Sequence, residues 1–244
     1  SFVPPDSYRE RHKRIFTSIR ARKFAFTMPL YKTINFSATT QILVWEITES
    51  LEELLSKVDL KEKTQNRLNG MKSELHQRAF LSVRMLLKEA GYTDFDLHYD
   101  EFGKPYLSPN ERHTEPVEVS ITHSHQFSAI IISDETVGID IEMQREKILR
   151  IADKFVNDEE LSRLRSFDQN DYIRKLTVKW GAKEAIFKIR NEKGISFKDH
   201  IRVNVFEMND EETLSQLSFE GITQEFRIVF EEFEGFTLVY AFEN

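Results

Sequence analysis

Alternating hydrophobic and polar positions mark the central part of the chain as rich in β-strands. Val117, Val119 and Ile121 alternate with polar residues, and the same period returns over residues 137–142. A period of two places successive side chains on opposite faces, which is typical of a half-buried strand. Residues 127–133 are mostly apolar and predict a buried strand. Further strands are predicted over residues 41–47, 202–206, 225–230 and 236–242.

Apolar residues spaced three and four positions apart predict helices on either side of this central region. The strongest pattern covers residues 71–90. Arg78 and Arg84 fall on the polar side of this helix, so we expect both guanidinium groups to be solvated, and contact with an anion is the alternative. Further helices are predicted over residues 146–166 and 169–190 and in a short segment that begins after Ser50.

The order of these elements indicates an α+β fold in two halves. A strand and helices come first, then strands, then helices and again strands, so each half would combine a principal helix with a mostly antiparallel sheet. We place the boundary near residue 137. This gives an N-terminal half over residues 28–137 and a C-terminal half over residues 138–244, preceded by residues 1–27.

Residues 1–27 differ in charge from the rest of the chain. They hold seven Lys and Arg but only two Asp and Glu, a net charge of +5, whereas the whole chain carries −7. We interpret them as a poorly ordered or non-native extension and expect a native start at Met28; a transit-like segment and a nucleic-acid-binding arm remain alternatives. The acidic remainder argues against general nucleic-acid binding, because it would repel phosphates.

Composition and missing motifs exclude several other classes of protein. A chain of 244 residues with 40% hydrophobic and 31% charged residues fits a globular protein with a sizeable core. Cysteine is absent, which excludes disulfides, thiolate nucleophiles and iron–sulfur clusters, so oxygen or imidazole must hold any metal. The apolar stretches are too short to cross a bilayer. The Rossmann, P-loop, zincin and hydrolase-elbow motifs are also missing.

Two carboxylates stand two positions apart in the predicted strand that begins near Gly138. Asp140 and Glu142 share one face, roughly 7 Å apart along the strand, while Ile139 and Ile141 face the core. Like charges held together raise a pKa or recruit a cation, and carboxylate oxygens favour Mg²⁺ or Mn²⁺. The alternative is a solvated strand face, which is the commoner meaning of an isolated Asp-x-Glu pair.

A second unusual segment is the predicted helix around Trp180. Helical spacing places Glu184 at the edge of the buried apolar stripe, with Lys188 one turn beyond it on the same side. On these residues alone, the alternative is an ordinary surface pair that stabilises the helix by roughly a few tenths of a kcal/mol.

Taken in order, four segments resemble the motifs of the Sfp-type 4'-phosphopantetheinyl transferases. They are Gly103-Lys104-Pro105, Ser120-Ile121-Thr122-His123-Ser124, Gly138-Ile139-Asp140-Ile141-Glu142 and Trp180-x-x-Lys183-Glu184-Ala185-x-x-Lys188. The last two are highly specific together, and the resemblance extends over residues 28–244 with little detail before residue 70. Thr122 stands where the family often has serine, a change that keeps the hydroxyl group.

The resemblance implies two similar α/β halves in a pseudo-twofold arrangement, with coenzyme A bound in the cleft between them. The residues that it implies for Mg²⁺ binding at the coenzyme pyrophosphate are Asp140, Glu142 and Glu184. Lys104 and His123 would contact the phosphoadenosine end, and Lys188 would lie near the pyrophosphate. Either Glu184 or Lys188 would deprotonate the attacking serine, and the sequence leaves this choice open.

The implied activity is that of a Mg²⁺-dependent holo-[acyl-carrier-protein] synthase. It transfers 4'-phosphopantetheine from coenzyme A to a serine of an acyl or peptidyl carrier protein and releases 3',5'-ADP. We therefore expect a cytoplasmic monomer whose partners are the carrier protein and coenzyme A, without nucleic acid or membrane. The alternatives are a metal-dependent nucleotide phosphohydrolase and a non-catalytic module that binds coenzyme A or a carrier. We interpret His125 as a surface or core histidine. Lys61 and Lys63 are candidates for the N-terminal basic residues that contact the 3'-phosphate in the family, and we assign neither to the site.

Overall fold

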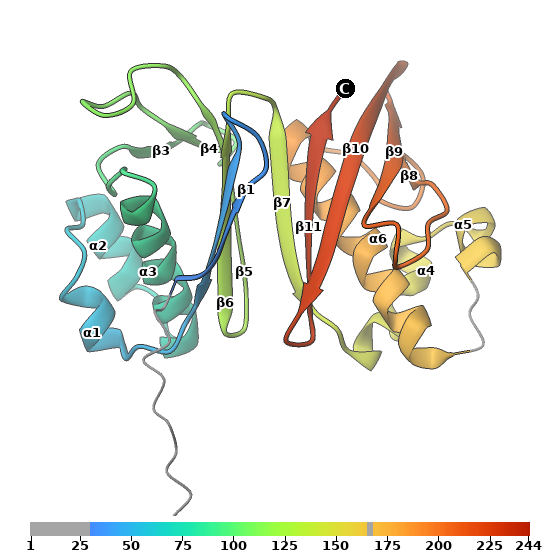
Figure 1. Ribbon diagram of the computed structural model, residues 1–244, viewed down its shortest axis with the longest axis horizontal. Helices are drawn as coiled ribbons and strands as arrows, with labels where there is room; N and C mark the ends of the chain where they lie inside the picture. Colours follow the sequence, from blue (N-terminus) through green and yellow to red (C-terminus); the bar gives the residue numbers. More distant parts are fainter. Residues whose placement is uncertain (1–29, 165–167) are drawn as a thin grey trace, which may run out of the picture.

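The computed structural model describes residues 30–164 and 168–244. The predictions for residues 1–27, and for a start at Met28, lie outside this part of the chain. The described residues form a mixed α/β structure in which two sheets lie between two groups of helices (Figure 1). Within those two ranges, every helix is too short or too polar to pass through a bilayer.

The first sheet is antiparallel, has four strands in the order β1-β2-β6-β5, and is covered on its outer face by helices. A two-stranded sheet, β3-β4, lies beside it. The elements are β1 (Leu30–Asn35), β2 (Gln41–Glu46), α1 (Leu51–Leu55), α2 (Glu62–Asn69), α3 (Glu74–Glu89), β3 (Leu97–Tyr99), β4 (Pro105–Leu107), β5 (Glu118–Ser124) and β6 (Phe127–Ser133). Buried residues of α3, including Leu81 and Leu86, pack against Leu43 and Ile130 of the sheet to form one core.

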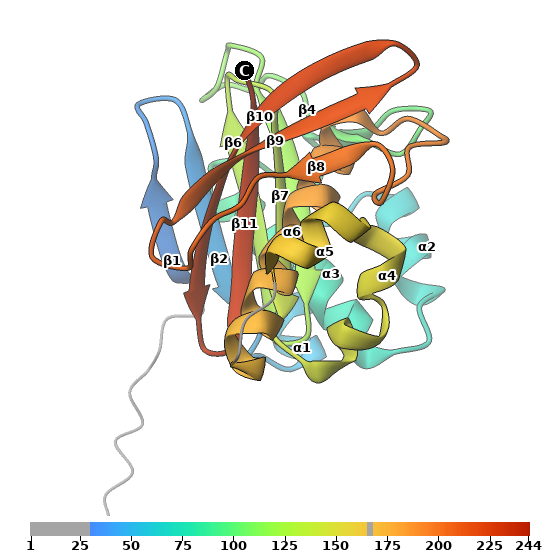
Figure 2. The same cartoon turned by 90° about the vertical axis from the view of Figure 1, so that its right-hand side faces the viewer.

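The second sheet has five antiparallel strands in the order β7-β11-β10-β9-β8, and the long helix α6 crosses its outer face (Figure 2). The elements are β7 (Val137–Met143), a 3₁₀ helix η1 (Glu146–Arg150), α4 (Ala152–Phe155), α5 (Asp158–Leu164), α6 (Gln169–Arg190), β8 (Ile201–Val203), β9 (Glu212–Phe219), β10 (Ile222–Phe233) and β11 (Phe236–Glu243). Ala182 and Ile186 of α6 pack on Phe226 and Val239 in a second core. A third core joins the inner faces of the two sheets.

The prediction of one continuous helix over residues 146–166 is wrong. The segment is divided into η1, α4 and α5, with residues 165–167 outside the described part. The break after α4 has a local cause, because Val156 takes an extended conformation and the Asn157 side chain accepts a hydrogen bond from the backbone N–H of Glu160. An asparagine that caps a new helix in this way stops the previous one from continuing. The helix predicted over residues 169–190 is confirmed as α6.

The prediction that the side chains of Arg78 and Arg84 are both solvated is wrong. Arg84 is buried, pairs with Asp94 at 3.1 Å, and lies over the ring of Phe80. Arg78 is partly buried and donates to the backbone oxygen of Ile47. Asp94 and Ile47 lie outside α3, so the helical pattern alone could not reveal these two partners.

Helix α2 and strand β9, which lack a clear pattern, are among the elements that escaped prediction. Helix α2 buries only Thr64 and Leu68, and a single pair of inward positions gives little periodic signal. Strand β9 buries Ser215 and Leu217, so one of its inward positions is polar. Both elements are fixed by the neighbours on which they pack rather than by their own hydrophobic pattern.

Candidate active site

Gly138 brings helix α6 unusually close to strand β7. A Cβ atom on Gly138 would lie 2.0 Å from the backbone oxygen of Ala185, a distance that no side chain tolerates. Gly181 similarly allows α6 to approach Val239, and a Cβ atom there would lie 3.8 Å from Oδ2 of Asp140. These two close approaches place the acidic strand against the helix that carries Glu184 and Lys188.

Asp140 is the buried centre of this contact, with 5% of its surface exposed. Its Oδ1 accepts hydrogen bonds from Lys188 Nζ at 2.8 Å and from Thr122 Oγ1 at 3.1 Å. Its Oδ2 is buried and has no hydrogen-bond partner. A buried carboxylate oxygen without a donor is costly, so this atom is suited to receive a cation or a further donor.

Glu142 lies on the same face of β7 as Asp140, as the period of two predicts. It accepts hydrogen bonds from Trp180 Nε1 at 3.3 Å and from Ser124 Oγ at 3.4 Å. Ile139 and Ile141, on the opposite face, are buried in the core between the sheets, which confirms the predicted alternation.

The electrostatics of the three carboxylates favour an additional positive charge. Burial and then the charge of Asp140 raise the pKa of Glu184 to about 7, against the opposing effect of Lys188. Burial and then Asp140 likewise raise the pKa of Glu142 above its ordinary value. Raised carboxyl pKa values show that the ionised forms are under-compensated here.

These residues fit Mg²⁺ by their chemistry, although they do not form a closed cluster. Within residues 30–164 and 168–244, no group of three or more His, Asp or Glu side chains is arranged to hold a metal ion. Asp140, with its unpartnered Oδ2, and the glutamates Glu142 and Glu184 nevertheless offer only oxygen donors, which a hard divalent cation prefers. Their charges repel one another, and a cation would relieve this repulsion.

Lys188 does not serve as an ordinary surface partner of Glu184. Its ammonium group reaches across to β7, where it donates to the backbone oxygen of Ile139 and to Asp140, both at 2.8 Å. The same side chain lines a pocket on its other side. Lys188 therefore connects the acidic strand to that pocket.

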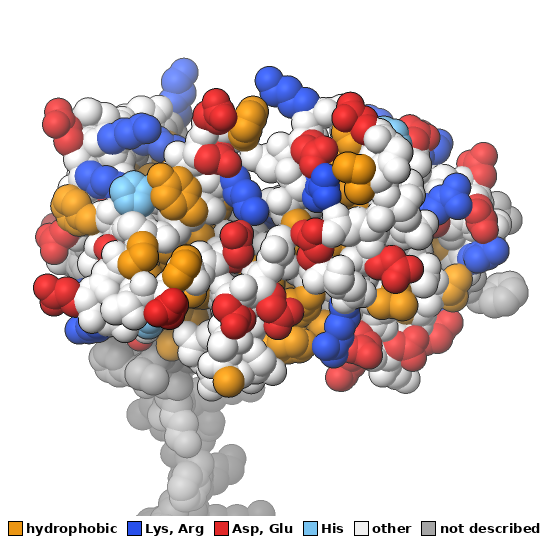
Figure 3. All heavy atoms as spheres, turned by 90° about the horizontal axis from the view of Figure 1, so that it is seen from above, with side chains coloured by type: hydrophobic (Ala, Val, Ile, Leu, Met, Phe, Trp, Pro, Cys, Tyr) orange, Lys and Arg blue, Asp and Glu red, His pale blue; other side chains and the backbone are white. Residues whose placement is uncertain are grey.

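The pocket is about 500 Å³ in volume and brings together three of the predicted site residues, Lys104, His123 and Lys188. Its walls come from α2, α3, β5, the β3–β4 connection and the end of α6. Figure 3 shows the end of the molecule at which β3–β4 and the last turn of α6 lie. Lys or Arg side chains, in blue, lie to the left and to the right of the centre of this view. The described residues around the pocket include no Asp or Glu, although the whole chain is acidic. Such a pocket suits an anionic ligand.

A tight turn presents Lys104 to this pocket. The side chain of Asp100 accepts hydrogen bonds from the backbone N–H groups of Phe102 and Lys104, and Gly103 adopts a left-handed conformation with φ of 86°. Asn191, at the end of α6, donates to the backbone oxygen of Phe102 at 3.1 Å. The turn is thus tied to the helix that carries Lys188.

His123 is exposed at the wall of the same pocket, on strand β5. Although its surface is open to the pocket, the protein atoms around the ring partly desolvate it and lower its pKa. The charges of His76 and Lys188 lower the pKa further, and that of Asp140 opposes them. Arg67 and His76 also line the pocket, and sequence reasoning missed both. A weak signal existed for Arg67, since it follows the basic residues Lys61 and Lys63 at helical distance.

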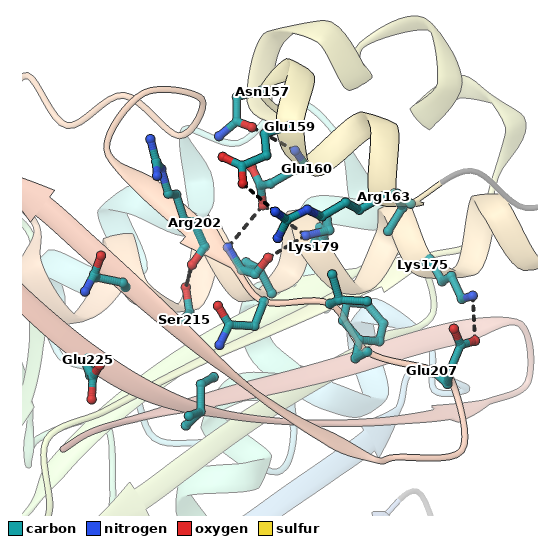
Figure 4. Close-up of a pocket in the computed structure, with 17 residues that line it drawn as sticks. Asn157, Glu159, Glu160, Arg163, Lys175, Lys179, Arg202, Glu207, Ser215 and Glu225 are labelled. Atoms are coloured by element: carbon teal, nitrogen blue, oxygen red, sulfur yellow. Dashed lines mark hydrogen bonds and ion pairs between the residues drawn. The ribbon is translucent and has the colours of Figure 1, made fainter.

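A second hollow of about 540 Å³ lies between α5, α6 and strands β8 and β9, away from the predicted residues (Figure 4). Most of its charged side chains already have partners, as in the pairs Lys179–Glu160 and Lys175–Glu207. Glutamates line this hollow beside its Lys and Arg side chains, whereas no Asp or Glu is among the described residues that line the pocket of Lys104, His123 and Lys188. This second hollow is therefore less suited to an anionic ligand than that basic pocket.

Lys183, next to Glu184 in the helix motif, has a structural role. It is fully buried and donates to Glu160 Oε2 and to the backbone oxygens of Phe155 and Phe197. Burial lowers its pKa to about 8 against the opposing effect of Glu160. Its three bonds fix α6 to α4, to α5 and to the connection that follows α6, and so hold the rotation of the helix that carries Glu184.

The family model described as "4'-phosphopantetheinyl transferase superfamily" matches residues 136–241. These residues are similar to that superfamily. The matched region contains β7 and α6, and therefore all three carboxylates and Lys188. Lys104 and His123 precede it.

A curated relative supports the same relationship. The 4'-phosphopantetheinyl transferase gsp of Aneurinibacillus migulanus is 32% identical over 89 residues. The alignment covers 36% of this chain and 35% of that protein, so the chain matches about a third of the length of its relative.

Proposed function

We propose that this protein transfers 4'-phosphopantetheine from coenzyme A to a serine hydroxyl of an acyl or peptidyl carrier protein. The observation that carries the proposal is the position of Lys188 between a basic pocket and a buried acidic strand. A pyrophosphate and the divalent cation that neutralises it require these two surroundings side by side. The superfamily match over residues 136–241 supports the same reaction.

Coenzyme A would occupy the basic pocket. Its phosphates would face Lys104, His123 and Lys188, and the absence of carboxylates from the described pocket wall favours such an anion. The apolar lining from Phe80, Val83 and other residues suits the non-phosphate parts of the molecule.

The residues that would hold Mg²⁺ are Asp140, Glu142 and Glu184. When bound there, the cation would neutralise the pyrophosphate and so favour departure of a phosphate leaving group. The supporting observations are the unpartnered Oδ2 of Asp140 and the raised pKa values of the two glutamates.

In the transfer step, the serine oxygen attacks the β-phosphorus of coenzyme A and forms a new phosphodiester bond. The bond from that phosphorus to the bridging oxygen breaks, and 3',5'-ADP leaves with the electron pair. We assign the serine proton to the Glu184 carboxylate. A bound cation would lower its pKa from the value of about 7 that it has without a metal, so the group would be ionised and able to accept a proton near neutral pH. The ammonium group of Lys188, which donates to Asp140 and Ile139, would contact the pyrophosphate.

We further propose two related halves, residues 28–137 and 138–244, in a pseudo-twofold arrangement. Support comes from the order of layers, in which each sheet has one principal helix, α3 or α6, on its outer face. Because one chain supplies every described wall of the pocket, we propose that the protein acts as a monomer.

The test is incubation of the protein with coenzyme A, Mg²⁺ and apo carrier proteins, followed by intact-mass measurement of each carrier. We expect the mass of one phosphopantetheine arm on a carrier, formation of 3',5'-ADP, and loss of both when EDTA is present. A carrier Ser→Ala variant is the matched control and should stay unmodified. Nucleotide hydrolysis without carrier modification would instead indicate a phosphohydrolase, and coenzyme binding without turnover would indicate a binding module.

A further inference from the structure

Strands β5 and β7 meet at the junction of the two sheets through side-chain hydroxyl groups. Each is the edge strand of its own sheet. The backbone N–H of Ile139 donates to Ser120 Oγ at 3.1 Å, and that of Ile141 donates to Thr122 Oγ1 at 3.2 Å. The two hydroxyls stand at alternate positions of β5, so they satisfy alternate backbone donors of β7.

Thr122 makes one contact that Ser120 lacks. While its oxygen accepts from Ile141, its hydroxyl proton is directed to Oδ1 of Asp140 at 3.1 Å. Lys188 donates to the same Oδ1 at 2.8 Å. Both donors therefore act on one carboxylate oxygen, and Oδ2 is left buried without a partner.

This arrangement fixes the orientation of the Asp140 carboxylate. A hydroxyl that already accepts a backbone N–H has a defined position for its proton, so it holds Oδ1 in one place. Thr122 is only 6% exposed and lies on a strand, so its side chain has little freedom to move. The free oxygen then keeps a constant direction.

We propose that Thr122 is a positioning residue that holds the Asp140 carboxylate so that Oδ2 is presented to a divalent cation. The inference rests on the proposed function, which assigns Asp140 to the cation. Hydrogen bonds to a metal-ligating carboxylate orient it, and loss of such a partner commonly weakens metal binding by about 10- to 100-fold.

The test measures Mn²⁺ binding to the full chain by electron paramagnetic resonance, without coenzyme A or carrier, so that activity is not the readout. Thr122→Val keeps the shape of the side chain but removes the hydroxyl, and Thr122→Ser keeps the hydroxyl. Ser120→Ala is the matched control, because it removes the neighbouring hydroxyl bond to β7 without touching Asp140. Thermal unfolding of each variant is recorded in parallel.

We expect Thr122→Val to bind Mn²⁺ about tenfold more weakly and Thr122→Ser to bind it as the wild type does. Ser120→Ala should lose about as much thermal stability as Thr122→Val does, but it should keep the Mn²⁺ affinity of the wild type. If Thr122→Val does not fold, Thr122→Ala replaces it with the same expectation.

Equal Mn²⁺ affinity of the wild type and a folded variant without the Thr122 hydroxyl would overturn the positioning role alone. An equal loss of affinity in Ser120→Ala would also overturn it, because the effect would then follow the junction rather than Asp140. Equal affinity of the wild type and Asp140→Asn would overturn the assignment of the cation to Asp140, and the inference would fail with it.

Discussion

Gly138 of β7 faces the backbone oxygen of Ala185 in α6 so closely that an added Cβ atom would lie 2.0 Å from it. The contacted atom belongs to the backbone of a helix, so no side-chain rotation can relieve the clash. This pair of residues sets the distance between the acidic strand and the helix that bears Glu184.

Replacement of Gly138 by Ala should therefore destabilise the protein by about 3 kcal/mol or more, because strand and helix must separate. Urea unfolding monitored by circular dichroism measures this. Gly70→Ala is the matched control, since Gly70 has an ordinary helical conformation and its nearest contact would be 3.4 Å away. Its stability should be unchanged or rise by about 0.5 kcal/mol. Equal effects of the two substitutions would contradict the proposed close approach.

Asp140→Asn should lower kcat/KM by at least about 100-fold and raise the Mg²⁺ concentration needed for half-maximal activity, because the carboxylate is lost from the cation site. The free energy of unfolding should change by less than about 1 kcal/mol, since loss of the Lys188 pair opposes relief of repulsion with Glu142 and Glu184. Carrier mass spectrometry over a Mg²⁺ series and chemical unfolding measure the two effects. Asp134→Asn, on an exposed turn, should match the wild type in both. Normal Mg²⁺ dependence in Asp140→Asn would exclude the metal role.

His123→Ala should weaken the use of coenzyme A but leave 3'-dephospho-coenzyme A nearly unaffected, because the analogue lacks the phosphate that His123 is proposed to contact. The measurement is kcat/KM for both donors. His125→Asn is the control, since asparagine tolerates the left-handed conformation of His125. Equal losses for both donors in His123→Ala would rule out the anchoring role.

The same contact predicts a pH dependence of coenzyme A binding. Shielding from water lowers the pKa of free His123 below its ordinary 6.5, and a bound phosphate would raise it. Binding then takes up a proton, so affinity should fall as pH rises from the free to the bound pKa. Isothermal titration calorimetry at several pH values should show this trend in the wild type and not in His123→Ala.

Lys188→Arg should retain about a tenth or more of kcat if Lys188 contacts the pyrophosphate, whereas Lys188→Met should lose nearly all activity. The guanidinium group keeps the positive charge but cannot act as a base near neutral pH. The pH profile of kcat separates the two roles further, since its lower limb should persist in Lys188→Arg if Glu184 accepts the proton. Complete inactivity of a folded Lys188→Arg variant would favour Lys188 as the base.

Glu160→Gln should destabilise the protein by about 3 to 5 kcal/mol, because it leaves the buried ammonium groups of Lys179 and Lys183 without their shared carboxylate. Glu159→Gln is the neighbouring control. It breaks a pair with Arg163 whose side chains are 56% and 61% exposed, and should cost at most about 0.5 kcal/mol.

The effect of Glu160 should also depend on pH. Burial raises its pKa, but Lys179 and Lys183 lower it more, so the pKa lies below the ordinary 4.5 in the folded protein. The contribution of Glu160 is present above that ordinary value and is lost as pH falls through the folded pKa. Unfolding curves of the wild type and Glu160→Gln should converge at acid pH, and a constant difference would contradict the pairing.

The sequence by itself determined the elements whose patterns are internally complete. In β7 the apolar and acidic residues alternate, and in α6 apolar residues recur at helical spacing, so the sides on which Asp140, Glu142 and Glu184 lie could be inferred from local geometry. The structure nevertheless buries positions on both sides of each element. The resemblance also named the superfamily whose model matches residues 136–241, because its motifs combine residue types at fixed spacing.

Only the tertiary structure decided which side chains meet. Lys188 lies one helical turn from Glu184, yet its ammonium group binds Asp140 and Ile139 on another element, and Arg84 is buried because Asp94 approaches from a loop. The hydroxyl of Thr122 likewise reaches Asp140 only because β5 and β7 lie edge to edge. Periodicity fixes the direction of a side chain relative to its own backbone. Its partners, burial and pKa depend on the packing of segments far apart in sequence, which no local pattern encodes.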